Sequence, residues 1–256
     1  MHSKPRLLAI VVLILFALPA AADNMCAAGN LSTVMFTTCD IGPLTFSFAG
    51  FGAATTSAAY IYDGDGNIID IAYTHYDPVT PSDFYFTPVS NGFTLSFLYG
   101  PRSITAPLSG FADDSAYVFF TVATSGGGIT QVHVSGDPSW FSFDGPGTAE
   151  GYNANRIATY SPYYYDMCEQ IGATYASGTI TVPTDWQCVG GPPITDAPYG
   201  TASPFSLTAW DGATAGWNGA DATFTFDTAV PEPGTLILLG TGLLGLAGAV
   251  RRRLLS

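Results

Sequence analysis

Four oxygen-bearing side chains are crowded into one short, glycine-rich stretch of the sequence. Oxygen ligands at alternate positions of a turn are the arrangement that Ca²⁺ prefers. The stretch departs from an EF-hand loop, because its sixth and twelfth positions hold isoleucine and threonine in place of glycine and glutamate. Asp-Gly and Gly-Asn pairs also form ordinary hairpin turns, so a plain turn is the alternative. The candidate calcium ligands are Asp63, Asp65, Asn67 and Asp70.

The sequence contains no constellation that indicates catalysis. His75 and His133 stand alone, and the GxSxG, HExxH and P-loop motifs do not occur. The close acid pairs are Asp113-Asp114 and Asp166 with Glu169, and paired carboxylates can hydrolyse glycosides. Adjacent residues of a strand point to opposite faces, so Asp113 and Asp114 are poorly placed to act together. We therefore expect a protein that is not an enzyme, with no catalytic residues.

An aromatic cluster offers a different chemistry, because flat rings with polar tips can stack on sugars. The alternative is simple packing around a nearby disulfide. The cluster consists of Tyr160, Tyr163, Tyr164, Tyr165, Tyr175 and Trp186.

The N-terminus has the pattern of a signal peptide. Lys4 and Arg6 precede an apolar run over 7–18, Pro19 ends it, and alanines fill 20–22. We expect signal peptidase to cut after Ala22, so residues 1–22 leave the mature chain. An uncleaved N-terminal anchor is the alternative.

Export places all four cysteines in an oxidising compartment, where an even count favours two disulfides. Three pairings are possible. The local one needs the least loop closure and joins Cys26 to Cys39 and Cys168 to Cys188. A metal site is disfavoured, because CxxC spacing and nearby histidines are missing.

The C-terminal segment, 230–256, is predicted to enter a membrane. Residues 235–250 carry no charge, and a helix of that length spans about 24 Å, which is short for a bilayer core. Arg251, Arg252 and Arg253 follow as a membrane stop that keeps the C-terminus cytoplasmic.

This segment resembles a known sorting signal. Val-Pro-Glu-Pro-Gly-Thr at 230–235, a glycine- and leucine-rich span and the arginine cluster are similar to the PEP-CTERM signal. The resemblance implies recognition by an exosortase, with Pro231, Glu232 and Pro233 as substrate residues. It also implies a Gram-negative bacterium that makes exopolysaccharide, and delivery of the protein from an inner-membrane-anchored precursor to the cell surface or extracellular matrix.

The body between these ends, 23–229, is predicted to be all-β. Apolar and polar residues alternate in short runs, and Asp-Gly, Asn-Gly and Gly-Pro pairs separate them. About ten short strands indicate a β-sandwich of jelly-roll or immunoglobulin-like type. We expect the stretch 152–200, rich in proline, tyrosine and glycine, to be a long loop region. The predicted strands are 44–48, 58–62, 68–73, 93–97, 117–123, 129–134, 179–182, 205–210 and 223–227.

The charge separates the body from its ends. The whole chain has a formal charge of −13, but residues 23–230 hold 19 acids and two arginines, or −17, with no lysine. Such a field repels phosphates, which disfavours nucleic acid as a partner. The leading hypothesis is a surface or matrix protein without catalytic activity that associates with exopolysaccharide. The alternatives are a carbohydrate- or calcium-binding adhesin module and, less favoured, a polysaccharide-acting enzyme.

Overall fold

The computed structural model of the protein describes residues 24–75, 78–125, 127–159, 165–182, 186–187 and 192–229. For His75, Tyr165, Trp186, Gln187 and Pro198 only the backbone is described. The predicted signal peptide, 1–22, and the predicted tail, 230–256, lie outside these residues.

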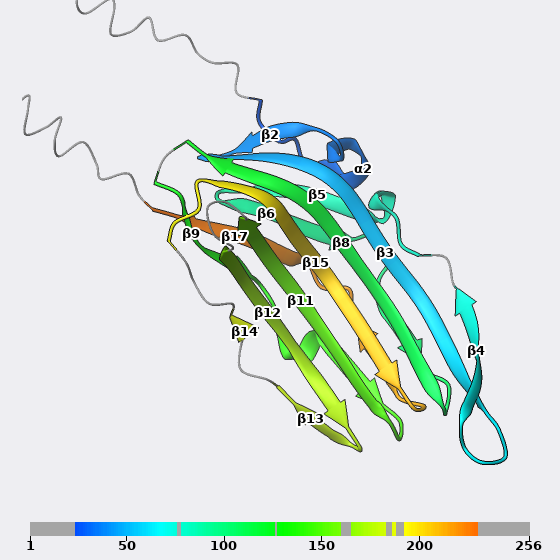
Figure 1. The fold of residues 1–256 in the computed structure, drawn as a ribbon. Helices are drawn as coiled ribbons and strands as arrows, with labels where there is room; N and C mark the ends of the chain where they lie inside the picture. Colours follow the sequence, from blue (N-terminus) through cyan, green and yellow to red (C-terminus); the bar gives the residue numbers. More distant parts are fainter. Residues whose placement is uncertain are drawn as a thin grey trace, which may run out of the picture.

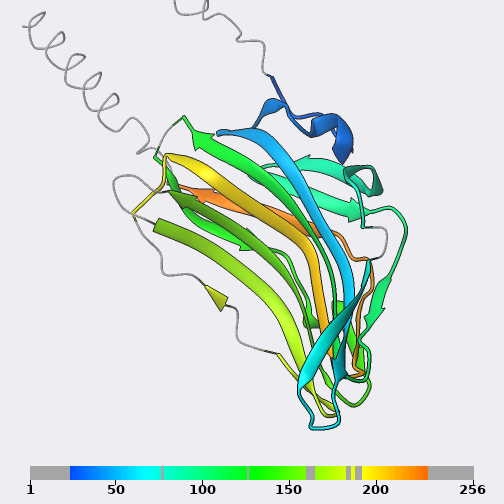
Figure 2. The same ribbon diagram turned by 45° about the vertical axis from the view of Figure 1, so that its right-hand side comes forward.

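The largest element is a nine-stranded sheet whose central strands are unusually long, and every strand pairing in it is antiparallel. Its members curve together, as Figures 1 and 2 show. In order across the sheet they are β13 (Thr179–Thr181), β12 (Tyr165–Ala176), β11 (Thr148–Thr159), β15 (Asp196–Trp210), β8 (Gly110–Thr124), β3 (Leu44–Tyr62) and β2 (Thr38–Ile41), while β14 (Trp186–Gln187) pairs with β12 and β4 (Ile68–His75) with β3.

Two smaller sheets pack against one face of this large sheet and lie behind it in Figure 1. The five-stranded sheet has the order β1 (Gly29–Asn30), β5 (Phe84–Val89), β6 (Gly92–Phe97), β17 (Ala222–Thr228) and β9 (Ile129–Val134). The three-stranded sheet has the order β10 (Phe141–Asp144), β16 (Thr214–Trp217) and β7 (Arg102–Thr105). Three single-turn helices complete the described elements: α2 (Leu31–Val34), η1 (Pro81–Asp83) and η2 (Pro138–Trp140).

A phenylalanine cluster forms the core between the sheets. Phe46 and Phe48 of the large sheet meet Phe93 of the small sheet with ring centroids 5.7 and 5.6 Å apart. Aromatic pairs in tilted and edge-to-face arrangements contribute about 1 kcal/mol beyond the burial of their area. Residues of both layers belong to one continuous buried cluster. The architecture is therefore all-β and consistent with the predicted β-sandwich.

The positions of the predicted strands are confirmed, but those that belong to β3, β8 and β15 are much too short. β9 coincides with the predicted 129–134, whereas 44–48 and 58–62 belong to one 19-residue strand, β3. The largest error is the loop region expected over 152–200, because β11, β12 and β15 run through it as central parts of the large sheet.

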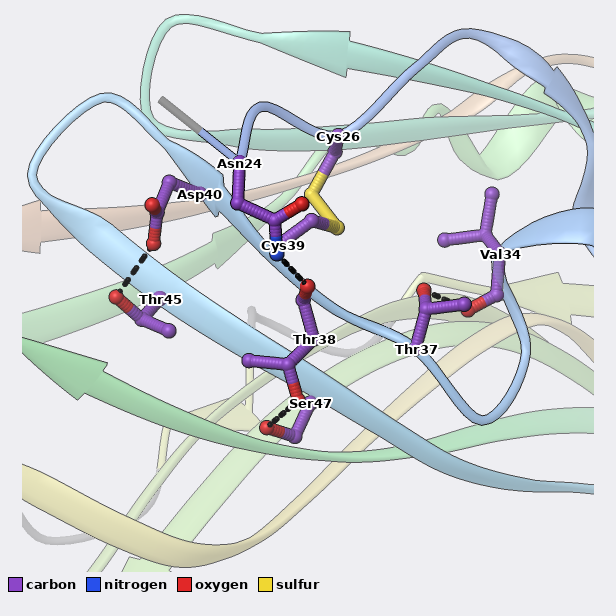
Figure 3. The surroundings of a disulfide bond; sticks show 9 residues. All are labelled: Asn24, Cys26, Val34, Thr37, Thr38, Cys39, Asp40, Thr45 and Ser47. Atoms are coloured by element: carbon purple, nitrogen blue, oxygen red, sulfur yellow. Dashed lines mark hydrogen bonds between the residues drawn. A yellow bond between two sulfur atoms is a disulfide. The ribbon is translucent and has the colours of Figure 1, made fainter. Parts of the chain in front are cut away.

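The predicted local disulfide at the N-terminus is present. Cys26 and Cys39 are joined across a sequence separation of 13 residues. Figure 3 shows the bond beside β2, where Asn24 donates a side-chain hydrogen bond to the carbonyl of Thr38. The bond and this contact attach the first described residues to the edge of the large sheet. Cys168 is also disulfide-bonded, and Cys188 lies outside the described residues.

Candidate functional site

The face of the large sheet that points away from the small sheets is the first candidate, and we call it the outer face. Side chains on it come from alternate residues of β3, β8, β15 and β11, and most are partly exposed. In Figure 1 this face is turned to the viewer, and no described strand lies in front of it.

Glycines of β3 let an aromatic ring lie flat on the outer face. Gly50 and Gly52 stand in register with Phe119 and Tyr117 of β8. A Cβ atom at Gly52 would lie 3.0 Å from the Phe119 ring, and one at Gly50 would lie 3.7 Å from it. The ring therefore covers the space that side chains would occupy, which flattens this part of the face.

Two carboxylates lie in one row across three strands of the outer face. Asp113 of β8 is opposite Thr208 of β15, which is opposite Glu150 of β11. Burial raises the pKa of Asp113, and the charge of Asp114 adds to the effect. Burial also raises the pKa of Glu150, and the charge of Asp113 adds to it. The row therefore holds two negative charges that destabilise one another.

A pair of tyrosines forms the next row. Tyr117 donates a hydrogen bond from its hydroxyl to Ser206 at 3.5 Å, and Ser206 is opposite Tyr152. Burial raises the pKa of Tyr152 to about 12, with smaller contributions from Tyr117 and Glu150. The Tyr152 hydroxyl is therefore neutral at physiological pH and can donate or accept a hydrogen bond.

Apolar rings border the carboxylate row on its other side. Phe111 of β8 is opposite Trp210 of β15, and both side chains are partly exposed. At the far end of the face, Arg156 holds Asp166 with Nε 2.8 Å from one carboxylate oxygen and lies over the Tyr199 ring at 5.8 Å. The outer face thus combines aromatic rings, hydroxyl groups and two carboxylates in neighbouring rows.

A polar cavity of about 540 Å³ lies on the inner side of the sheet, beside β7. Asp114 is buried there, and Arg102 binds it through Nε at 2.7 Å and Nη2 at 2.6 Å. Thr55 donates a hydrogen bond to the same carboxylate at 2.8 Å. The prediction that Asp113 and Asp114 face opposite ways is confirmed by this arrangement.

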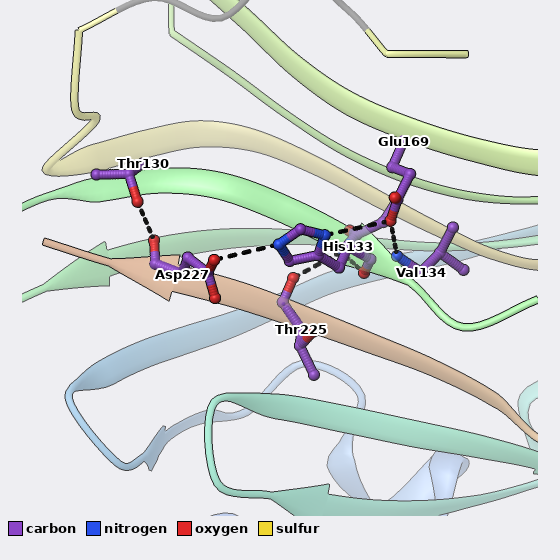
Figure 4. Close-up of polar contacts among 7 residues, drawn as sticks. Thr130, His133, Val134, Glu169, Thr225 and Asp227 are labelled. Carbon is purple, nitrogen blue, oxygen red and sulfur yellow. Dashed lines mark hydrogen bonds and ion pairs between the residues drawn. The ribbon is translucent and has the colours of Figure 1, made fainter. Parts of the chain in front are cut away.

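His133 lies between two carboxylates at the edge of the sandwich (Figure 4). Its Nδ1 is 3.6 Å from Glu169 of β12, and its Nε2 is 3.2 Å from Asp227 of β17. Glu169 also accepts a hydrogen bond from the backbone N–H of Val134, at 2.5 Å. The cluster links the two layers where β9 approaches β12. Glu169 points inward and Asp166 outward, so the predicted acid pair is not brought together.

Two asparagines of β11 point into the sandwich near this cluster. Asn155 donates from Nδ2 to the carbonyls of His133 and Thr225, at 2.9 and 3.3 Å. Asn153 donates to the carbonyl of Pro204. Their side-chain oxygens are buried and accept no hydrogen bond within the described part of the chain. Amides at inward positions replace the large apolar side chains that a buried strand usually carries.

The predicted calcium turn is a hairpin turn between β3 and β4. One carboxylate oxygen of Asp63 accepts the backbone N–H groups of Asp65 and Asn67 at 2.9 and 2.8 Å. These bonds lower the pKa of Asp63. Asp70 accepts the N–H of Ile71. Within the described ranges, no group of three or more His, Cys, Asp or Glu is arranged to hold a metal ion. Calcium at this turn stays a prediction.

The predicted aromatic cluster falls largely on residues that the structure does not describe. Tyr160, Tyr163 and Tyr164 lie outside the described residues, and for Tyr165 and Trp186 only the backbone is described. Tyr175 is buried, donates a hydrogen bond to the carbonyl of Gly145 at 2.6 Å and stacks on Phe143. This tyrosine therefore packs against its neighbours.

The sequence patterns do not single out Glu150, Tyr152 and Trp210 as surface residues. A signal was present, because Glu150, Tyr152, Ala154 and Arg156 alternate with smaller residues at the period of a strand. The inward positions between them hold one glycine and two asparagines, so the large apolar residues that usually mark the buried face of a strand are missing.

The C-terminal segment is the part of the chain that matches a known motif. The chain's last described strand, β17, ends at Thr228, and the profile of the PEP-CTERM protein-sorting motif matches residues 229–253. The chain carries a PEP-CTERM sorting motif. No curated protein shows significant similarity to the chain.

The PEP-CTERM motif supports an exported protein that an exosortase sorts from a membrane-anchored precursor. The match includes Pro231, Glu232 and Pro233, the expected recognition residues, and all three arginines of the cluster. None of the helices in the described ranges has the length and apolar character needed to cross a membrane. The span predicted over 235–250 lies outside those ranges.

Proposed function

We propose that this protein is delivered to the cell surface or extracellular matrix and binds polysaccharide there without catalysing a reaction. The observation that carries the proposal is the outer face of the large sheet. It presents partly exposed Phe111, Trp210, Tyr117 and Tyr152 beside serine and threonine hydroxyls, on a surface that no described element covers.

A sugar ring has a flat apolar side and a rim of hydroxyl groups. Aromatic rings on adjacent strands supply apolar contact, and neighbouring hydroxyls supply hydrogen-bond partners. The PEP-CTERM motif supports export of the body, which brings this face into contact with extracellular polymers.

The test uses the full-length protein purified in detergent and a glycan array. We expect binding to at least one class of polysaccharide, with no release of shorter oligosaccharides during incubation. Trp210→Ala should weaken binding by about tenfold, the equivalent of losing one interaction of about 1.4 kcal/mol. Trp210→Phe keeps a ring and is the matched control.

Three outcomes of the glycan-array test would contradict parts of the proposal. Binding that survives Trp210→Ala unchanged, in a variant with native circular dichroism, contradicts the use of the outer face. Loss of polymer length during incubation contradicts the absence of catalysis. No binding to any polysaccharide contradicts the proposal as a whole.

A further inference from the structure

The carboxylate row gives the outer face a chemical preference. Asp113 and Glu150 lie two strands apart, so their Cα atoms are about 9 to 10 Å apart in a sheet with strands about 4.8 Å apart. Their side chains flank Thr208, which offers a hydroxyl between them. A small cation above Thr208 would therefore meet oxygen atoms from both sides.

The two carboxylates of the row lack a positively charged partner among the described residues. Both body arginines already hold a carboxylate: Arg102 binds Asp114 on the inner side, and Arg156 binds Asp166 at the far end of the face. Body residues 23–230 include no lysine. Within the described residues, Asp113 and Glu150 have no basic side chain as a salt-bridge partner. The row thus attracts positive charge and repels anionic polymers.

A protonated amine fits the row better than a metal ion. Ca²⁺ takes six to eight oxygen ligands that converge at about 2.3 to 2.6 Å, and no cluster of three acidic, histidine or cysteine side chains is formed in the described part of the protein. An ammonium group has three N–H donors and needs only a few acceptors. Aromatic rings on both sides, Trp210 and Tyr152, favour a cation that is carried on a ring.

We propose that the outer face selects an amino-sugar polysaccharide, whose protonated amine lies between Asp113 and Glu150 above Thr208. The proposal rests on the polysaccharide binding proposed above and adds the class of sugar. Neutral polymers contact the rings and hydroxyls, while a glucosamine polymer adds charge-assisted hydrogen bonds to the two carboxylates, which are about twice as strong as neutral ones.

The experiment compares three hexamers by isothermal titration calorimetry on the full-length protein in detergent. They are β-1,4-linked glucosamine, its fully N-acetylated form and β-1,4-linked glucose. We expect glucosamine to bind about tenfold more tightly than the other two at low salt, which corresponds to about 1.4 kcal/mol. The preference should shrink at high salt, because these carboxylates are only partly buried.

Two double variants distinguish binding at Asp113 and Glu150 from attraction by the negative net charge of the whole protein. Asp113→Asn with Glu150→Gln should remove the preference for glucosamine and leave binding of glucose unchanged. Asp196→Asn with Asp221→Asn is the control, because it removes two exposed acids elsewhere and changes the net charge equally. Equal losses in the two variants would overturn the proposal. A hexalysine peptide tests charge without sugar rings, and affinity equal to that of the glucosamine hexamer would also overturn it.

The outcomes distinguish the two proposals. Binding of all three hexamers with one affinity overturns the amine preference and leaves polysaccharide binding intact. Binding of none of them, nor of any glycan on the array, overturns both. Circular dichroism of each variant, compared with the unmodified protein, shows that loss of binding does not come from loss of the fold.

Discussion

Arg102 reaches through the inner side of the sandwich to Asp114 and holds it with two nitrogens, at 2.7 and 2.6 Å. The aspartate side chain is 1% exposed and the arginine side chain 23%. The second arginine of the body makes a comparable pair with Asp166, in which the arginine is 39% exposed and the aspartate 18%. The protein therefore has one buried and one partly exposed arginine–aspartate ion pair. We expect the difference in burial to determine how much each pair contributes to the free energy of unfolding.

Removal of Arg102, the cation of the buried pair, should destabilise the fold far more than removal of Arg156, the cation of the partly exposed pair. Arg102→Ala leaves an uncompensated buried carboxylate, and we expect the free energy of unfolding to fall by about 3 kcal/mol. Arg156→Ala should cost less than about 1 kcal/mol, because water screens that pair. Urea unfolding measures both. Equal costs in the two variants would contradict this assignment.

The carboxylate row predicts a pH dependence with a definite sign. The pKa values of Asp113 and Glu150 are raised above 3.8 and 4.5, so the folded state favours their protonated forms. Their contribution to stability is present below those values and is lost as the pH rises through the raised ones. Asp113→Asn with Glu150→Gln should therefore raise the Tm at pH 7, by no more than about 2 °C, because the groups are partly exposed.

The same double variant supplies an internal check at low pH. Near pH 3 the unmodified carboxyls are protonated in the folded and the unfolded chain, so the Tm difference should vanish. Thermal melts at both pH values measure it. A lower Tm for the variant at pH 7 would show that the two carboxylates stabilise the fold.

The N-terminal disulfide should contribute measurably to stability. Cys26 and Cys39 close a loop of 13 residues, and a bond of this kind stabilises a protein by about 3 kcal/mol, chiefly through the unfolded state. We expect Cys26→Ser with Cys39→Ser to lower the free energy of unfolding by about that amount. Urea unfolding of the variant checks this, and an unchanged midpoint would show that the segment is held by its other contacts.

The sorting motif predicts a processing defect. Replacement of Pro231, Glu232 and Pro233 by alanine should leave the protein bound to the membrane at its precursor mass, because the recognition residues are gone. Replacement of Leu254, Leu255 and Ser256 by alanine is the control and should be processed normally. Fractionation followed by mass spectrometry reports both. Normal release of the Pro231–Pro233 variant would contradict sorting through this motif.

Strand positions could be predicted wherever large apolar residues alternate with polar ones. The strand over 129–134 is of this kind, with Ile129, Val132 and Val134 buried. β11 lacked the pattern, because its inward positions include Gly151, Asn153 and Asn155. A strand whose inward side chains are small or carry amides has the sequence pattern of a loop. It can be recognised as a strand only from its pairing with neighbouring strands in the structure.

The carboxylate row could not be found from spacing. Asp113 and Glu150 are far apart in the chain, and they become neighbours because β15, which comes later than both, inserts between their strands. Strand order depends on long-range pairing that local pattern does not encode. The disulfide between Cys26 and Cys39 was predictable for the opposite reason, since the residues are close in sequence and loop closure favours local partners.

The position of β17 has a consequence for how the protein reaches its destination. This strand lies between β6 and β9 of the five-stranded sheet, yet it is the last strand before the sorting motif. Phe224 and Phe226 of the core arrive with it. During synthesis and translocation, the phenylalanine core therefore cannot close until β17 has emerged. The sorting motif follows β17 directly and implies a membrane-anchored precursor, so the body can complete its fold only when the segment that carries the sorting signal is about to emerge.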